Sequence, residues 1–425
     1  MYERQLIFTN IDLFSSNSKT KFYKKIFDVI DLSNLPEYVP SKFGPKCYSR
    51  HALFRSFIVM KAEKLCEITE LCDFLDTNPY IAYLCGFEPF KPLPSYSVFQ
   101  RFIKDLDNES LKEIMNSQVL KLVDLGYIDN SFISCDATPV FANTKQNNPK
   151  SFAANKFNKD NPPKSDSDCK LGVYTASNSH NEKKYEFYWG YKNVVLTDAI
   201  SGLPIAEVTV PANVAESSIT IDFLKDTNQW FSLKDTYFIG DKAYDTKDIH
   251  NFIRHVLDGH AFIPLNPRNT KKKKMLNDSN VICEAGLAMH KDGRQYFDSY
   301  IKQKFCCPFR TKKDDSLCPC KHPKYFNGKK NRGCTSYIST GTDYRASINR
   351  ESVFFKKIYA LRTESERYNS RWKNLNLENP SVRNIDSITN LNTFGHIMLL
   401  SLALAAIADN QKDKVRSLAK FKKIS

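Results

Sequence analysis

The sequence predicts an α/β core that follows an α-helical N-terminal domain and is interrupted by an insertion. Apolar residues recur at spacings of three and four from about Lys21 to Lys121, which indicates amphipathic helices. After Gly126, short apolar runs alternate with helix-like stretches, as in a sheet flanked by helices. Residues 268–350 break this alternation, because they contain four consecutive lysines and half of the 12 cysteines.

We therefore expect four segments along the chain of 425 residues. They are a helical N-terminal domain, the first part of the α/β core, a cysteine-rich basic insertion, and C-terminal helices that complete the core. Their predicted ranges are 1–128, 129–267, 268–350 and 351–425. A chain of this length is long enough for two or three domains, or for one large core that carries insertions.

Within the helical domain, LPSYSVFQRFIKDL follows a proline-containing loop and predicts a short amphipathic helix. Ser95 or Ser97 is the expected N-cap. Arg101 and Lys104 fall on its exposed side. Two interpretations of these cations remain open: a solvated helix face, or a surface that contacts DNA.

The α/β core is predicted from a succession of short elements. A strand leads to Asp136, a polar stretch at 143–170 reads as a loop, and residues 189–210 form a hairpin around Ile200–Gly202. A helix follows, then a short strand that stops at Asp241, a helix with Asp245 as its N-cap, and a last strand. The first helix is expected at 216–231, the short strand at 235–240, the second helix at 245–257 and the last strand at 260–266.

Charge and hydropathy narrow the class of protein. The 62 Lys and Arg residues exceed the 47 Asp and Glu residues, which leaves a formal charge of +15. This excess suits a polyanionic partner, because neutralised phosphates release condensed counterions; a general bias toward lysine is the alternative. No secretory signal pattern is visible. The longest apolar run, Ile397–Ala408, is shorter than the roughly 20 residues of a membrane span. We expect a buried core helix, no membrane contact and a cytoplasmic location with reduced thiols.

The stretch YALRTESERYNSRWK raises the question of which glutamate carries function. On a helix that turns about 100° per residue, one arc of roughly 80° collects a single carboxylate among polar and cationic side chains. Glu364 falls on the opposite side. The members of the arc are Tyr359, Arg362, Glu366, Asn369 and Lys373. A surface helix with ion pairs worth a few tenths of a kcal/mol would also produce such a pattern.

Two aspartates could bind a metal ion together with Glu366. Asp136 and Asp241 each follow a short apolar strand, where ligand-binding acids are common in α/β sheets, although turn capping is the alternative. If the three acids converge, their mutual repulsion requires a cation. Mg²⁺ prefers such oxygen ligands, and two ions about 4 Å apart can catalyse phosphodiester chemistry.

The same residues resemble the DDE transposases of bacterial insertion sequences. Tyr359, Arg362, Glu366 and Lys373 match the Tyr-(2)-Arg-(3)-Glu-(6)-Lys signature of one branch of these enzymes. SCDATPV and FIGDKAYD are similar to the blocks around the first and second aspartates. The resemblance implies an RNase H-like catalytic fold, with Asp136, Asp241 and Glu366 holding two Mg²⁺ or Mn²⁺ ions.

The resemblance also implies partners, an activity, a bacterial nucleoid-associated location, and a DNA-binding or assembly role for the helical domain at 1–128. The chain would cut double-stranded DNA at the terminal inverted repeats of an element and join the freed 3′ end to target DNA, as a homodimer on DNA. The signature residues would hold the DNA backbone, and Asn369, Lys242 and Thr138 are further candidates from the matching blocks. A catalytically inactive DNA-binding derivative, acting as a repressor or scaffold, is the main alternative. A nuclease without end specificity is another.

The cysteines of the insertion suggest a second metal. Cys283, Cys307, Cys334 and either Cys318 or Cys320 could form a four-thiolate zinc site with long spacers; our chosen set includes Cys320. His290 and His322 are spare ligands. Because paired CxxC motifs are absent, reduced structural thiols remain the alternative. Any zinc here should be structural, since the expected catalytic carboxylates lie elsewhere in the sequence.

Overall fold

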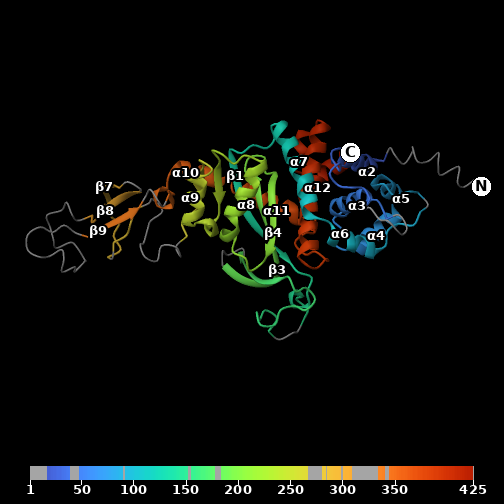
Figure 1. Ribbon diagram of the computed structural model, residues 1–425, viewed down its shortest axis with the longest axis horizontal. Helices are drawn as coiled ribbons and strands as arrows, with labels where there is room; N and C mark the ends of the chain where they lie inside the picture. The colour runs from blue at the N-terminus through green and yellow to red at the C-terminus, as the bar shows by residue number, and fades with distance from the viewer. Residues whose placement is uncertain are drawn as a thin grey trace, which may run out of the picture. The chain divides into compact units, whose positions relative to one another are not determined.

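The computed structural model describes residues 17–38, 47–89, 91–151, 155–177, 183–266, 280–283, 285–297, 300–308, 334–339 and 344–424. The chain falls into two compact units (Figure 1). Unit 1 comprises residues 1–129, 136–214 and 364–425, and unit 2 comprises residues 130–135 and 215–363. The four segments expected from the sequence are a different division of the chain and stay a prediction.

The N-terminal part of unit 1 is helical, as its apolar periodicity predicts. Its helices are α2 (Ser18–Asp28), α3 (Arg50–Ala62), α4 (Ile68–Thr77), α5 (Pro79–Cys85), α6 (Tyr96–Asp105) and α7 (Asn108–Asp124). The side chains of Asn17, Ser49 and Asp107 cap three of them by accepting backbone N–H bonds. Ser95 is the N-cap residue of α6, which confirms one of the two expected positions.

The core of unit 1 is built around α12 (Ile385–Ala408), which α7, α3 and α6 contact. Figure 1 shows α7 and α12 side by side. The helix is buried on almost all sides, as expected of a helix enclosed by others, and its C-terminal half is apolar apart from Ser401. Of the described residues, only this helix is long and apolar enough to cross a membrane, and 89% of its apolar window is buried inside the protein. The predicted core helix at Ile397–Ala408 is therefore confirmed and begins twelve residues earlier. The other C-terminal helices are α11 (Thr363–Lys373), η6 (Lys412–Lys414) and α13 (Leu418–Ile424).

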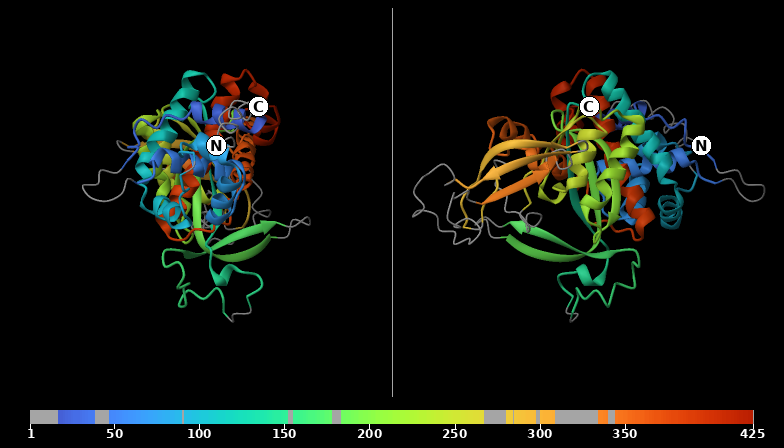
Figure 2. Two further views of the ribbon diagram at one scale, coloured as in Figure 1. Left: turned by 90° about the vertical axis from the view of Figure 1, so that its right-hand side faces the viewer. Right: turned by 60° about the vertical axis from the view of Figure 1, so that its left-hand side comes forward.

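The sheet of unit 1 centres on a long hairpin. Strand β3 (Lys183–Asp198) pairs antiparallel with both β2 (Lys170–Ser177) and β4 (Pro204–Pro211). The predicted turn between β3 and β4 is confirmed, and Gly202 adopts a positive φ of 66° there. The paired β2 and β3 project from the sheet (Figure 2). Strand β1 (Phe132–Phe141) lies on the other side of β3.

Two elements of unit 1 are absent from the sequence prediction. They are the 3₁₀ turn η1 (Lys145–Asn147) and strand β2. The side-chain amide of Asn147 donates to the carbonyls of Ala142 and Trp189, both at 2.7 Å, and its carbonyl accepts from the Trp189 amide. Polar side-chain bonds therefore organise the start of this stretch, and they leave no hydrophobic period for sequence reasoning to find.

Unit 2 contains a parallel part of the sheet. The first residues of β1 pair with β5 (Tyr237–Gly240), which pairs with β6 (His260–Phe262). The predicted helices are confirmed as α8 (Glu216–Trp230) and α9 (Lys247–His255). Further elements are η2 (Lys242–Tyr244), η5 (Tyr344–Ser347) and α10 (Val353–Ala360).

The predicted insertion carries a second sheet, which is antiparallel. It consists of β7 (His290–Phe297), β8 (Tyr300–Cys306) and β9 (Thr335–Ser339). A small core of Val281, Cys283, Met289 and Phe305 packs beside it, with Cys334 partly buried against this core. The lysine run at 271–274, Cys318, Cys320 and His322 lie outside the described residues.

Candidate active site

Asp136 and Asp241 follow directly on paired positions of two parallel strands. In unit 2, Cys135 of β1 is the register partner of Gly240 of β5. The strand residues before both positions are buried, which is typical of parallel strands covered on both faces. The sequence suggested that a strand ends at Asp136. This is wrong, because β1 runs on to Phe141 beside β3. What ends after Cys135 is the pairing with β5.

Asp241 begins the turn η2. Its Oδ1 accepts the backbone N–H of Ala243 at 2.7 Å, so the capping role considered for this residue is present. Within η2, the buried Tyr244 places its phenol 3.4 Å from the Cys135 thiol, which donates to it. This contact fixes η2 against the end of the β1–β5 pairing. Lys242 is exposed.

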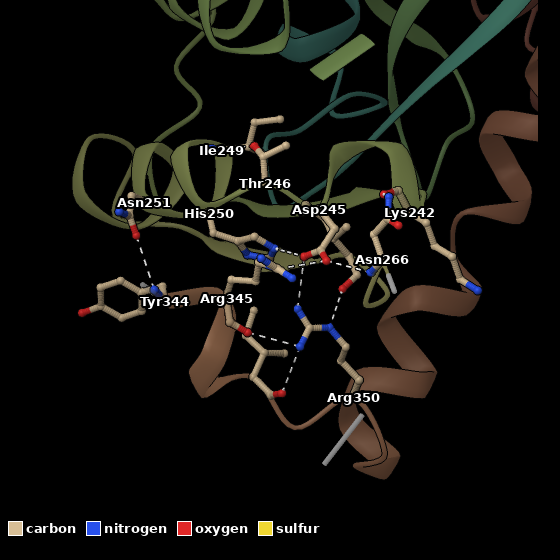
Figure 3. A network of polar contacts seen from close by, with 12 residues as sticks. Lys242, Asp245, Thr246, Ile249, His250, Asn251, Asn266, Tyr344, Arg345 and Arg350 are labelled. Atoms are coloured by element: carbon tan, nitrogen blue, oxygen red, sulfur yellow. Dashed lines mark hydrogen bonds and ion pairs between the residues drawn. The ribbon is translucent and has the colours of Figure 1, made fainter. Parts of the chain in front are cut away.

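Asp245 lies at the centre of a buried polar network (Figure 3). Its Oδ1 accepts from His250 Nε2 at 3.0 Å and from Arg350 at 3.4 Å. Its Oδ2 accepts from the Asn266 backbone amide at 2.7 Å and from Arg345 Nε at 3.0 Å. The prediction that Asp245 caps the next helix is wrong, because Thr246 is the N-cap of α9.

The charges of this network explain its protonation. Burial by itself would raise the pKa of Asp245, but the bonds from His250 and Asn266 and the two guanidinium groups lower it below its usual value. Burial lowers the pKa of His250 despite its acidic neighbour. Asp245 is therefore a carboxylate, and His250 is neutral and donates through Nε2. Because Arg345 and Arg350 are among the last residues of the predicted insertion, the network joins the end of the insertion to the block that begins at Asp241.

In unit 1, α11 contacts the first aspartate. Asn369 Nδ2 donates to Asp136 Oδ2 at 3.0 Å, and the Asn369 side chain is largely buried. Glu366 lies one turn before Asn369 on the same face of α11 and is exposed, as the sequence arc predicts. The structure therefore brings Asp136 and one face of α11 together.

The assumption of one continuous helix from Tyr359 to Lys373 is wrong. Helix α10 ends at Ala360, and α11 begins at Thr363. The amides of Leu361 and Arg362 bond three residues back, and the Thr363 hydroxyl donates to the Ala360 carbonyl at 2.9 Å. This tight turn replaces the regular four-residue bonds. Tyr359 and Arg362 therefore lie outside α11, where the Arg362 guanidinium is 5.9 Å from the Tyr359 ring centroid.

The remaining charges of α11 have intramolecular partners. Lys373 Nζ lies 2.5 Å from Glu378 Oε1. Glu364 forms ion pairs with Arg367 and with Arg416, the latter at 3.1 Å, and its side chain is only 14% exposed. These contacts assign Glu364 a structural role and distinguish it from the exposed Glu366.

The buried face of α11 rests on a neutral histidine. The Tyr368 hydroxyl bonds His396 Nδ1 of α12, and His396 Nε2 lies 3.0 Å from Asn193 Oδ1 of β3. Burial lowers the pKa of His396 to about 3, so Nε2 carries the proton and Nδ1 accepts. Trp372 stacks on the same imidazole. The orientation of α11 is thus set by its contact with α12, where His396 is itself held by β3.

Other predicted site residues occupy different environments. Thr138 is buried within β1, with 3% of its surface exposed, which suits a supporting position better than direct contact with phosphate. Arg101 and Lys104 are exposed on α6. Asp245, Asn193 and His396 were missed by sequence reasoning, because their partners lie far away in the chain and no local pattern marks them.

No ready metal cluster exists among the described residues. In this part of the chain, no three His, Cys, Asp or Glu side chains are placed so that they could hold an ion. The residues without such a cluster include Asp136, Asp241 and Glu366, and also Cys283, Cys307 and Cys334. The donor chemistry of the three acids nevertheless fits Mg²⁺, which takes carboxylate oxygens and keeps water in its shell. Zinc in the insertion stays a prediction, because Cys320 is outside the described residues.

Comparison with known proteins identifies the family. The family described as Transposase DDE domain matches residues 128–401, which is more than half of the chain, and the family described as Transposase domain (DUF772) matches residues 11–105. The chain belongs to the DDE transposase family. The expected membership in a family of transposases is thereby confirmed.

No curated protein matches the chain. One solved structure, described as "Cryo-EM structure of piggyBac transposase synaptic complex with hairpin DNA (SNHP)", is similar at 10% identity over 98% of this chain and 78% of that chain. Its TM-score of 0.37 is too low to indicate a common fold.

Proposed function

We propose that this protein is an insertion-sequence transposase that cuts DNA at the ends of its element and transfers the freed strand into target DNA. Its RNase H-like core would use Asp136, Asp241 and Glu366 as catalytic residues. The observation that carries the proposal is the bond between Asn369 and Asp136, because it holds the Glu366 face of α11 at the strand that bears the first aspartate. The parallel register of Cys135 and Gly240, one residue before each aspartate, supports it.

The three acids would hold two divalent ions, Mg²⁺ or Mn²⁺. When bound, such ions activate a water or a 3′ hydroxyl and stabilise the leaving oxygen of a phosphodiester. Asn369 orients the Asp136 carboxylate by donating to Oδ2, and Asp241 keeps its position through the backbone bond to Ala243. Metal binding lets three carboxylates remain ionised at close range, which they could not do alone.

Basic side chains would place the DNA backbone. Lys373 would exchange Glu378 for a phosphate, since an ion pair that is about one-third exposed contributes little stability. Arg362 would act together with Tyr359, whose ring it contacts. The exposed Lys242 adds a cation next to Asp241. We further propose that two copies act together on DNA, one at each element end.

The test compares cleavage of a supercoiled plasmid that carries the element ends, in Mg²⁺ or Mn²⁺. Glu366→Gln should bind the ends as the wild type does and lose cleavage by at least a hundredfold, because a metal ligand is removed. Glu364→Gln is the matched control, since the same change at a structural ion pair on the same helix should leave cleavage within a few-fold.

Three outcomes separate the alternatives. Cutting by the wild type and by Glu364→Gln, but not by Glu366→Gln, supports the transposase with the proposed acid. Binding of the ends without cutting by any of the three indicates an inactive DNA-binding protein. Cutting of plasmids with and without the ends, and no strand transfer, indicates a general nuclease.

A further inference from the structure

Unit 1 contains a polar groove that the proposed catalytic residues do not use. Its volume is about 530 Å³, and four segments line it: the start of α4, the exposed side of α6, the loop after β1 and the segment that leads into α12. Three cations lie on this lining, Arg101 and Lys104 from α6 and Arg383 from the segment before α12. Almost the whole α/β core separates Arg383 from the other two in sequence.

The three cations are not neutralised by the protein. In the part of the chain that the structure describes, none of them forms an ion pair with a carboxylate. Arg101 Nε donates to the Ser97 carbonyl at 3.2 Å, and Arg383 Nε donates to the Asn143 carbonyl at 3.1 Å. These bonds hold the two guanidinium groups in place at the groove and leave their charge uncompensated.

The other lining groups are also suited to an anion. The first residues of α4 and of the 24-residue α12 contribute to the groove, so the positive ends of two helix dipoles add to the three charges. Hydroxyl and amide side chains, including Tyr96, Gln100 and Ser381, also line the groove, together with the apolar Ile68 and Val382. Hydroxyls and amides are side-chain types that contact DNA phosphates.

One lining residue has the opposite charge. Glu67 stands at the N-terminus of α4, where it forms a capping box with Glu70 and accepts the Thr69 hydroxyl at 3.0 Å. Its bonds within the helix end account for its presence. Its charge should nevertheless weaken the binding of any anion in the groove, which gives the test a variant of opposite sign.

We propose that this groove binds the phosphate backbone of duplex DNA, with Arg101, Lys104 and Arg383 each neutralising one phosphate. The inference rests on the proposed function, because it names where DNA contacts unit 1 away from the proposed acids. Amide and hydroxyl side chains lie beside the three cations along the groove. The groove therefore positions DNA by its backbone and does not read bases.

The experiment measures the salt dependence of binding, using a fluorescent duplex that carries an element end, without divalent metal. A variant with Arg101→Gln, Lys104→Gln and Arg383→Gln is compared with the wild type at KCl concentrations of about 50 to 200 mM. Losing three phosphate contacts should reduce the slope of log affinity against log salt by about 2.7 and weaken binding more than tenfold at about 0.1 M.

Two controls make the result specific. Lys24→Gln, Lys121→Gln and Lys420→Gln together remove three exposed cations from other parts of unit 1, and this triple variant should keep nearly the wild-type slope. Glu67→Gln preserves the hydrogen-bonding shape of the cap and should tighten binding by a few-fold. Circular dichroism of each variant checks that it folds.

Equal slopes for the groove variant and the control variant overturn the inference. The inference also fails if inorganic phosphate binds to the wild type and not to the groove variant while both proteins show the same slope for DNA. That result would indicate a site for a small anion. If the wild type itself does not bind DNA, the proposed function fails. If the wild type binds and only Glu366→Gln loses cleavage, the proposed function stands whatever the groove variant does.

Discussion

Replacing Asp245 with alanine should destabilise the fold around the second aspartate more than any surface change in the same region. Asp245 is fully buried, and its two oxygens accept bonds from two arginines, a histidine and a backbone amide (Figure 3). Alanine would leave Arg345 and Arg350 buried without a counter-charge. Removing one partner of a buried ion pair typically costs about 3–5 kcal/mol. We expect about 4 kcal/mol here.

Asp248→Ala provides the matched control. Asp248 is exposed in the first turn of α9, three residues after Asp245, and interacts with the helix dipole. Its removal should cost no more than about 1 kcal/mol. Guanidinium unfolding measures both variants, and hydrogen exchange of the α9 amides reports the local effect, because a chain with two compact units need not unfold in one step.

The pH dependence provides a second check on the same network. The pKa of Asp245 is lower in the folded state than in the unfolded state, so its contribution to stability is present above about pH 4 and is lost as pH falls through the folded pKa. The difference in stability between wild type and Asp245→Ala should therefore shrink below pH 4. A cost below about 1 kcal/mol at pH 7, equal to that of Asp248→Ala, would refute the reasoning.

Two further predictions concern the support of α11 and the insertion. The folded pKa of His396 is about 3 against an ordinary 6.5, so only the unfolded chain takes up this proton, and the wild type should lose about 2 kcal/mol of stability between pH 7 and pH 5 through this residue. In His396→Gln this part of the acid dependence should disappear from urea unfolding curves, and an unchanged pH slope would contradict the assignment. For the insertion, elemental analysis of purified protein should find about one zinc per chain, and Cys334→Ser should lower that content. Zinc far below one equivalent in the wild type rules the site out.

Most helices, the two parallel strands before the aspartates and the choice of the acid to test could be predicted from the sequence. Apolar spacings of three and four predicted the N-terminal helices and the core helix, because burial of one face repeats with the helical period. The short apolar runs before Asp136 and Asp241 predicted the two neighbouring strands. The helical angles singled out Glu366 over Glu364, and on α11 Glu364 forms ion pairs with Arg367 and Arg416, whereas Glu366 is exposed.

Features that depend on contacts between distant parts of the chain could be seen only in the tertiary structure. Asp245 looks like an N-cap in sequence. In the folded protein it is the centre of a buried network, and its partners Arg345 and Arg350 lie about a hundred residues further along the chain. The break after Ala360 follows from local three-residue bonds that leave the apolar pattern unchanged. The groove of Arg101, Lys104 and Arg383 exists only because α6 and the segment before α12 meet. Periodicity encodes which face of an element is buried, whereas the partner of each buried charge is set by the packing of the elements.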